Sequence, residues 1–248
     1  MEVHHHSHHP KKWKEYITEF LMLFLAVTLG FFAENIREKV VESHRAHEYM
    51  VTMIQDLKED TSRINIAIRN TDRKVKAMDT LIRTIYKTPY TDTTIRLMYY
   101  LHRRYMGSST TVSFSRRTIN QLISSGNLRL IKNMAISDSI VQYDIGTEIT
   151  TRQYDVYHDQ FQQKARELSN RIFDSYYLLD YSRENVINLL NTNSKLTLLT
   201  SDEKFIKEYA NIVYGGKNVL AIYSVLLNNH KKLAEQIIDQ LSKEYQIK

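Results

Sequence analysis

Five of the first nine residues are histidines, the side chains of this chain best suited to binding a metal. His4, His5, His6, His8 and His9 could bind Zn²⁺, Ni²⁺ or Cu²⁺ through neutral imidazole nitrogens. A dedicated metal site also needs fixed geometry and supporting hydrogen bonds, which such a run lacks. A flexible polar tail or a purification tag explains the same residues. We therefore predict neither a metal site nor a cofactor.

Basic residues form the second group with chemical potential. Residues 63–132 contain fourteen Lys and Arg against three Asp, a net charge of +11. Within this region, the candidates for binding an anionic ligand, such as the phosphates of a polymer or of lipid headgroups, are Arg103, Arg104, Arg116 and Arg117. The tyrosines interleaved with the first two arginines also fit a helix that packs through its aromatic face, and this interpretation is the favoured one.

Catalytic motifs are missing from the sequence. It has no phosphate-binding glycine loop, nucleophile elbow, zinc-protease motif or paired acids on a loop. The absence of cysteine excludes disulfides, thiolate metal ligands and a cysteine nucleophile. His102 and His158 lie beside charged residues, which is typical of surface groups, and His230 lies on an apolar face, which is typical of a core histidine. We therefore predict no catalytic residue and no enzymatic activity.

The spacing of apolar residues indicates an all-α fold. Apolar residues recur at helical rather than alternating intervals, and the 248 residues include only six Gly and two Pro. We predict an N-terminal transmembrane helix that continues into a long helix, packed in an antiparallel helical bundle. The expected organisation is a His-rich basic tail at 1–15, a transmembrane helix at 16–33 and a helical bundle domain at 34–248.

The predicted membrane span is the apolar run before Glu34. Uncharged residues occupy positions 20–33, and the extension to Tyr16 gives about eighteen residues, or roughly 27 Å of helix. Trp13 and Tyr16 would lie at the membrane interface. Two alternatives remain open: a signal peptide cleaved after Gly30, and a buried core helix.

The sequence contains less evidence for the orientation of the span than for the span itself. Lysines precede the apolar run and a similar number of basic residues follow it, so the positive-inside rule gives a tie. A short cytoplasmic tail with a translocated C-terminal part is the commoner arrangement for an N-terminal anchor. We therefore expect a single-pass protein of the bacterial inner (cytoplasmic) membrane, with its bundle on the extracytoplasmic side in the cell envelope.

From Ile36 to Ile85 one face of the sequence recurs at alternating spacings of four and three, and eleven of its fifteen positions are apolar. This heptad pattern predicts a coiled-coil seam, buried by later helices of the chain or by a second copy. Burial within the chain is favoured for the distal half. The basic residues outside the predicted a and d positions are expected on a solvated outer face: Arg63, Arg69, Arg73, Lys74, Lys76, Arg83 and Lys87.

Start and stop signals divide the rest of the chain into helices. Thr88–Pro89 is expected to break the first long helix, and Asp92 to cap the next. A capping box is expected at 200–203, and Gly215–Gly216 are expected to act as a hinge. The expected helices are 93–106, 115–125, 135–179 with a bend near Gly146, a helix ending at 214, and 218–245, while 195–200 is the only candidate strand.

The order of several motifs resembles a known group of proteins. After the apolar anchor the chain reads Tyr49–Met50–x3–Ile54–x–Asp56–Leu57–x2–Asp60, and later Phe114–x7–Leu122–x2–Ser125–Gly126–x–Leu128–x–Leu130–Ile131–x–Asn133–x2–Ile136–x3–Ile140–x2–Tyr143. This order is similar to an uncharacterised family of single-span membrane proteins, a domain of unknown function typical of Bacteroidota. The resemblance covers about residues 17–240. It implies a topology and a cellular setting, and it carries no known activity.

Two functions are consistent with these features. The first is a membrane-anchored helical bundle that acts as a scaffold, accessory subunit or sensor input through protein–protein contacts, with a second copy or an envelope protein as partner. The alternative is a binding module for an anionic polymer or lipid that uses the basic region 63–132. Nucleic acid is not an expected partner of a bundle outside the cytoplasm.

Overall fold

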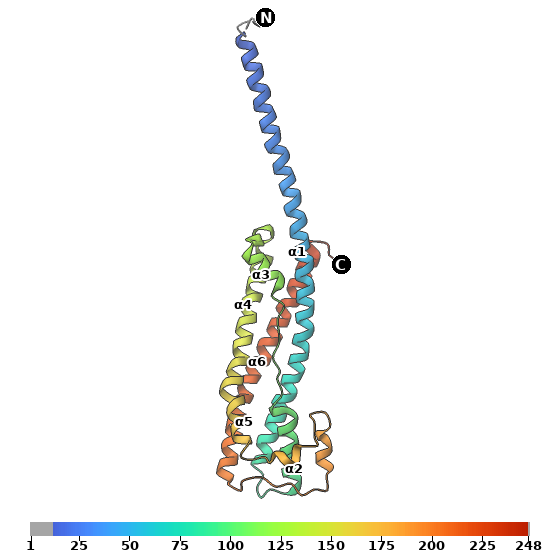
Figure 1. Ribbon diagram of the computed structural model, residues 1–248, viewed down its shortest axis with the longest axis vertical. Coiled ribbons are helices and arrows are strands. Elements are labelled where there is room, and N and C mark those ends of the chain that lie inside the picture. Colours follow the sequence, from blue (N-terminus) through green and yellow to red (C-terminus); the bar gives the residue numbers. More distant parts are fainter. Residues whose placement is uncertain (1–11, 248) are drawn as a thin grey trace, which may run out of the picture. The chain divides into compact units, whose positions relative to one another are not determined.

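The computed structural model describes residues 12–247 and is all-α, as predicted (Figure 1). Its α-helices are α1 (Trp13–Ile85), α2 (Asp92–Leu101), α3 (Arg117–Ser124), α4 (Met134–Tyr157), α5 (Gln163–Ser169) and α6 (Glu203–Glu244). Two π-helical turns, η1 (His102–Met106) and η3 (His158–Gln162), continue α2 and α4. The short 3₁₀ turns are η2 (Asn127–Leu130), η4 (Ser175–Leu178) and η5 (Val186–Asn191).

The chain divides into two compact units, residues 1–49 and 50–248, and α1 contributes to both. In the first unit, the large apolar side chains between Phe20 and Phe32 are exposed. The most apolar 18-residue window of α1 has a mean hydropathy of 1.9 and contains no buried residue. By length and composition, α1 is therefore a candidate membrane span. A buried core helix is the wrong interpretation of this segment, because none of the window is buried. A signal sequence has the same length and apolar composition as a membrane span, so that alternative stays open.

In the second unit, α4 and α6 pack against each other in antiparallel directions (Figure 1). The amide of Gln153 on α4 donates to the carbonyl of Val219 on α6, and the Tyr154 ring contacts that of Tyr223. Further toward the start of α4, the Tyr143 ring stacks on His230, which lies further along α6. As residue numbers fall along α4 they rise along α6, which is the arrangement of an antiparallel bundle.

The buried side of α1 is displaced from the predicted seam. All d positions from Met50 to Ile85 are buried, as predicted, whereas all a positions beyond Ile54 are only half-buried. The g positions, which the heptad pattern places outside the seam, are buried instead: Met53, Asp60, Ala67, Lys74 and Leu81. The physical reason is that α1 contacts both α4 and α6, through pairs such as Asp60–Tyr143 and Asp79–Lys217, and so buries a broader stripe than a two-helix seam.

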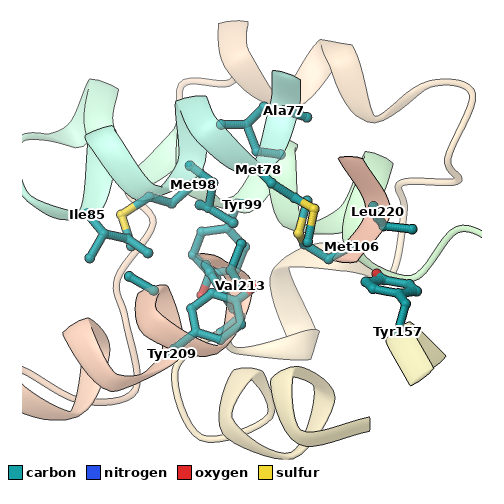
Figure 2. Packing of buried hydrophobic residues seen from close by; sticks show 14 of the residues in the cluster. Ala77, Met78, Ile85, Met98, Tyr99, Met106, Tyr157, Tyr209, Val213 and Leu220 are labelled. Atoms are coloured by element: carbon teal, nitrogen blue, oxygen red, sulfur yellow. The ribbon is translucent and has the colours of Figure 1, made fainter. Parts of the chain in front are cut away.

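Figure 2 shows the core at the end of the bundle where α1 stops. Side chains from four helices and one π-helical turn meet there: Met78 and Ile85 from α1, Met98 and Tyr99 from α2, Met106 from η1, Tyr157 from α4, and Tyr209 and Val213 from α6. The Tyr99 ring meets Phe173 edge-on at 5.1 Å, an arrangement that aromatic rings prefer. Tyr99 also donates to the carbonyl of Thr197 and accepts from the amide of Asp174, so its buried hydroxyl is fully used. The cluster therefore ties the irregular region 172–198 to the bundle.

The connection from η1 to α3 is extended and runs back along α1. Together with the first two residues of α3 it is called the return segment here, residues 107–118. In this segment, the Ser108 carbonyl accepts a hydrogen bond from Lys74, and the Ser113 carbonyl accepts one from Arg63. Further on, the amide of Ser115 donates to Asp60 at 2.7 Å. The partners on α1 move toward the N-terminus as the return segment advances. The segment is therefore antiparallel to α1 and gains its backbone hydrogen bonds from α1 side chains.

Two buried carboxylates hold the far end of the return segment. Asp56 accepts from the Thr118 amide at 3.1 Å and from the Thr118 hydroxyl at 2.5 Å, and from Arg117 at 2.8 Å. Asp60 accepts from Ser115 and, at 2.8 Å, from the hydroxyl of Tyr143. Burial raises the pKa of Asp60, and the hydrogen bonds from Ser115 and Tyr143 offset part of that shift. These carboxylates join α1, the return segment and α4.

Three sequence-based boundaries are wrong. The helix predicted at 135–179 ends at Ser169, because Ile172 and Phe173 leave the helix to enter the core and the Ile172 carbonyl accepts from the Leu199 amide. The bend expected near Gly146 is absent, since α4 is regular to Tyr157 and the irregularity is the π-helical turn that follows. The predicted strand at 195–200 is reduced to an isolated bridge between residues 173 and 198.

The expected hinge at Gly215–Gly216 is also wrong, because α6 is continuous there. A Cβ at Gly215 would lie 2.3 Å from a ring carbon of Phe161, and one at Gly216 would lie 3.1 Å from Tyr157. These glycines therefore serve close packing between α6 and the end of α4, not bending.

Helix caps differ from the predictions by one or two residues. The N-cap of α2 is Thr91, whose hydroxyl accepts from the Thr94 amide, and Asp92 is the first helical residue. The N-cap of α6 is Asp202, whose carboxylate accepts from two amides of the first turn, and Thr200 instead accepts from the Asp202 amide. In both cases a neighbouring side chain of similar capping ability takes the position.

We expect Gly146→Ala to destabilise the fold, although the same change stabilises an ordinary helix by up to about 1 kcal/mol. A Cβ at Gly146 would lie 2.7 Å from Nδ1 of His230, whose ring is confined by Tyr143 and Phe114. The expected loss is about 1–3 kcal/mol in thermal unfolding followed by helical circular dichroism. In a His230→Ala background the loss should vanish, and an equal loss in both backgrounds would contradict the clash.

We expect Asp56→Ala to cost about 3 kcal/mol of unfolding free energy, because the buried Thr118 amide loses its acceptor. Asp239→Ala is the control. Its carboxylate is 60% exposed and pairs only with Lys243, so the expected loss is under about 0.5 kcal/mol. Equal losses in the two variants, measured by chemical denaturation, would show that Asp56 does not hold the return segment.

Candidate functional site

The structure separates the two predicted arginine pairs. Arg116 forms two hydrogen bonds of 2.8 Å with the Asp144 carboxylate, and Arg117 donates to Asp56. Both arginines are thus engaged by carboxylates of the chain itself. Arg103 and Arg104 lie in η1, at the opposite end of the return segment, where no such pairing occurs among the described ion pairs.

A cavity of about 220 Å³ opens beside η1 and is called the arginine pocket here. The end of η3, helix α5, η4 and the loop that follows complete its wall. Its lining residues are His102, Arg103, Met106, Gly107, Gln162, Ala165, Arg166, Ser169, Asn170, Ser175, Leu178 and Arg183. This set contains three guanidinium groups and no carboxylate.

The three arginines of the pocket are oriented by carbonyls or left open. Nε of Arg103 donates to the Tyr181 carbonyl at 3.0 Å, and Arg183 donates to the Gly107 carbonyl. Arg166 is exposed and has no described hydrogen-bond or ion-pair partner for its side chain. Among the described residues, none of the three forms an ion pair with a carboxylate. The charge of Arg183 acts on Glu184 in the neighbouring cavity, but no carboxylate lines the arginine pocket itself.

His102 adds polarity to the pocket but no positive charge. Its ring stacks on Phe173 at 4.4 Å, and its Nδ1 lies 3.3 Å from the Tyr209 hydroxyl. Burial lowers the pKa of His102 to about 4, and the charge of Arg103 adds to the shift. The imidazole is therefore neutral at pH 7. The sequence-based interpretation of His102 as a surface group is only partly right, because the residue is half-buried and its ring packs on Phe173 and Tyr209.

Gln162 presents an unused acceptor in the wall. Its side chain is 7% exposed, and its Nε2 donates to the Met106 carbonyl at 3.4 Å. No donor reaches Oε1. A buried carbonyl oxygen without a donor costs free energy, so this atom is unexplained by the fold alone.

A second cavity, of about 340 Å³, lies on the other side of Arg183. It is lined by Arg73 and Arg104 among others, and Arg104 donates to the Arg183 carbonyl at 2.7 Å. Here Glu184 supplies a negative charge. A hydrogen bond from Ser182 lowers the pKa of Glu184, and the charges of Arg104 and Arg183 contribute. This cavity therefore combines three guanidinium groups, of Arg73, Arg104 and Arg183, with one carboxylate, whereas no carboxylate lines the arginine pocket.

Lys74 is buried under the return segment, contrary to the solvated position expected for it. Its Nζ donates to the Ser108 carbonyl and lies 4.8 Å from the centre of the Tyr157 ring. Burial lowers the pKa of Lys74 to about 7, and the nearby charge of Arg183 adds to this effect. No carboxylate lies within ion-pair distance of Nζ among the described residues.

The remaining histidines do not form a metal centre. His158 is exposed and lies 2.7 Å from Asp159, as its sequence context predicts, and His230 is a core residue. Within residues 12–247, no three His, Asp or Glu side chains converge in a way that could hold a metal ion. The five N-terminal histidines lie outside the described residues.

Sequence reasoning identified Arg103 through its alternation with tyrosines, but it missed Arg166 and Arg183. Neither belongs to a motif, and both are far along the chain from η1. Their approach depends on two π-helical turns and on the departure of the chain from helix after Ser169. A surplus of arginine in a tyrosine-rich, glycine-poor region was the only signal available.

Comparison with known protein families, curated proteins and solved structures finds no match to this chain. The resemblance to single-span proteins of Bacteroidota therefore remains a prediction.

We expect Lys74→Met to raise the melting temperature at pH 7, and the gain to shrink as the pH rises toward 10. With a folded pKa of about 7 and an unfolded value near 10.4, the unfolded chain binds more protons between these limits. The wild-type free energy of unfolding therefore rises with pH, by on the order of a few kcal/mol.

The matched control is Lys76→Met, two residues away and exposed. Its difference from wild type should not change over the same pH range. A Lys74→Met difference that is equally flat would mean that Lys74 is charged in the folded protein at all these pH values.

Proposed function

We propose that this protein is a single-pass, membrane-anchored helical bundle of the bacterial inner membrane that acts through protein–protein contacts. Its role would be that of a scaffold, an accessory subunit or a sensor input, with the bundle on the extracytoplasmic side. The observation that carries the proposal is the continuity of α1, one helix of 73 residues that begins in an exposed apolar segment and ends in the bundle core.

The continuity of α1 supports transmission or positioning. Residues 50–85 of α1 supply buried side chains along their whole length, so the helix cannot rotate or slide without disturbing the core. A partner that binds the bundle would thus act on the same helix that carries the candidate span. The expected partner besides the membrane is a second copy of the chain or another envelope protein.

The alternative is a binding module for an anionic polymer or lipid through region 63–132. Exposed Arg69, Arg73 and Arg104 favour it. Against it, many basic groups of the region are engaged within the fold: Arg63 with Glu59, Arg83 with Asp79, Arg116 with Asp144, Arg117 with Asp56, and Lys74 in the core. The surface field is therefore weaker than the net charge of the region implies, and we rank this alternative second.

Single cysteines introduced into this cysteine-free chain test the topology. We expect Lys243→Cys, at a side chain that is 76% exposed, to react with a membrane-impermeant maleimide on intact cells, and Ser7→Cys to react only after lysis. The protein should remain in the membrane after alkaline extraction. The reverse labelling would place the bundle in the cytoplasm, and release by alkali would refute the anchor.

Gentle detergent extraction followed by cross-linking and mass measurement tests the mode of action. We expect a defined oligomer or a copurifying envelope protein. A monomer without any partner, obtained from membranes in which the labelling result holds, would refute action through protein–protein contacts while leaving the anchor intact.

A further inference from the structure

We propose that the arginine pocket binds the phosphate group of a small phosphate monoester. This proposal is independent of the membrane anchor and differs from binding of a polymer by region 63–132, because two of the three arginines, Arg166 and Arg183, lie outside that region.

The first argument is the uncompensated charge of the pocket. Three guanidinium groups line one cavity, no carboxylate lines it, and the single histidine in the wall is neutral at pH 7. Like charges gathered in a cavity repel one another, and an anionic ligand removes that cost. Arginine is also the side chain whose planar donors best match phosphate oxygens.

The second argument is the way the arginines are held. The Arg103 and Arg183 side chains each donate one hydrogen bond to a main-chain carbonyl, of Tyr181 and Gly107 respectively. A guanidinium has five N–H donors, so each retains donors for a ligand after this bond is made. The carbonyls orient the groups without neutralising them, which reduces the ordering cost of binding.

The third argument concerns the shape of the ligand. A carboxylate carries one negative charge, whereas a phosphate monoester carries about −1.5 to −2 and offers three terminal oxygens. Three guanidinium groups match the phosphate better in charge and in number of acceptors. The cavity of about 220 Å³ is below the roughly 300–1,000 Å³ of pockets for drug-sized ligands, so the ligand is small.

Gln162 is a polar, uncharged residue of the pocket wall. Its Oε1 is buried and has no donor, and its Nε2 donates to the Met106 carbonyl, so the side chain is a neutral part of the wall. Gln162 therefore adds no charge that would offset the three guanidinium groups.

Both π-helical turns of the described chain contribute to this one pocket. η1 provides His102, Arg103 and Met106, and η3 provides Gln162. Such turns are rare and occur often at functional sites. The irregular backbone of both turns thus lies at the cavity that three arginines and no carboxylate line.

The test is titration of the full-length chain in detergent with glycerol 3-phosphate, followed by calorimetry, with glycerol and acetate as comparison ligands. We expect saturable binding of glycerol 3-phosphate that exceeds binding of the carboxylate of acetate, and none of glycerol. Arg166→Gln, at an exposed position with no structural hydrogen bond, should weaken binding roughly tenfold or more.

Arg69→Gln is the control, because it removes the same charge from an exposed position on α1 that lines neither cavity. It should leave the affinity within roughly twofold of wild type. Unchanged helicity of both variants by circular dichroism excludes unfolding as the cause. Absence of binding to the wild type, or equal weakening by the two variants, would overturn the proposal.

A second arm separates a soluble phosphate from a lipid headgroup. Full-length protein in nanodiscs is mixed with vesicles of phosphatidylcholine, with and without phosphatidic acid, and its binding of glycerol 3-phosphate is measured in their presence. If the vesicles that contain phosphatidic acid do not reduce this binding, the ligand is soluble. If they reduce it, and Arg166→Gln abolishes binding of the protein to these vesicles, the phosphate comes from a lipid. Vesicle binding that is insensitive to Arg166→Gln would count against the pocket.

Discussion

The fold of residues 50–248 depends on the hydrogen bonds that two buried aspartates accept. Asp56 and Asp60 lie on α1 where a two-helix seam would leave them in solvent, yet both are buried. Their oxygens accept from the amide of Ser115, in the extended chain, and from the amide of Thr118, in the first turn of α3, and neither amide has a partner within a helix. Without these acceptors the return segment would have unpaired donors along a buried path. With them, the extended chain from η1 is paired near its end and the first turn of α3 is capped by Asp56.

The return segment explains why α1 buries more than a coiled-coil seam does. A helix that faces only one neighbour needs an apolar stripe of a and d positions. Here α1 faces α4, α6 and an extended chain, so the g positions are also covered, and these include Asp60 and Lys74. The polar groups are tolerated because the extended chain offers main-chain partners: an amide for the carboxylate and the Ser108 carbonyl for the ammonium. Their burial is a consequence of the third neighbour.

The sequence predicted what depends on periodicity and on single residues. The burial of the d positions of α1, the break at Thr88–Pro89 and the antiparallel bundle could all be predicted from the sequence, because apolar spacing and proline act locally. Of the arginine pocket, only Arg103 could be predicted in this way. Its geometry depends on π-helical turns, which have no sequence signature, and on the exit from helix at Ser169, which the core position of Phe173 imposes. Gly215–Gly216 shows the same limit: a hinge signal was overridden by the packing of Phe161.

The two ends of the return segment use arginine differently, and the difference lies in the acceptor. At the end near α3, Arg116 and Arg117 donate to carboxylates, so their charges are cancelled where the segment is pinned. At the end near η1, Arg103 and Arg183 donate to carbonyls, which orient a guanidinium but leave its charge unpaired. A carboxylate in those positions would stabilise the fold equally well and would leave nothing for a ligand. The lack of carboxylate partners for the arginines at the η1 end is therefore what turns a general excess of basic residues into a local requirement for an anion.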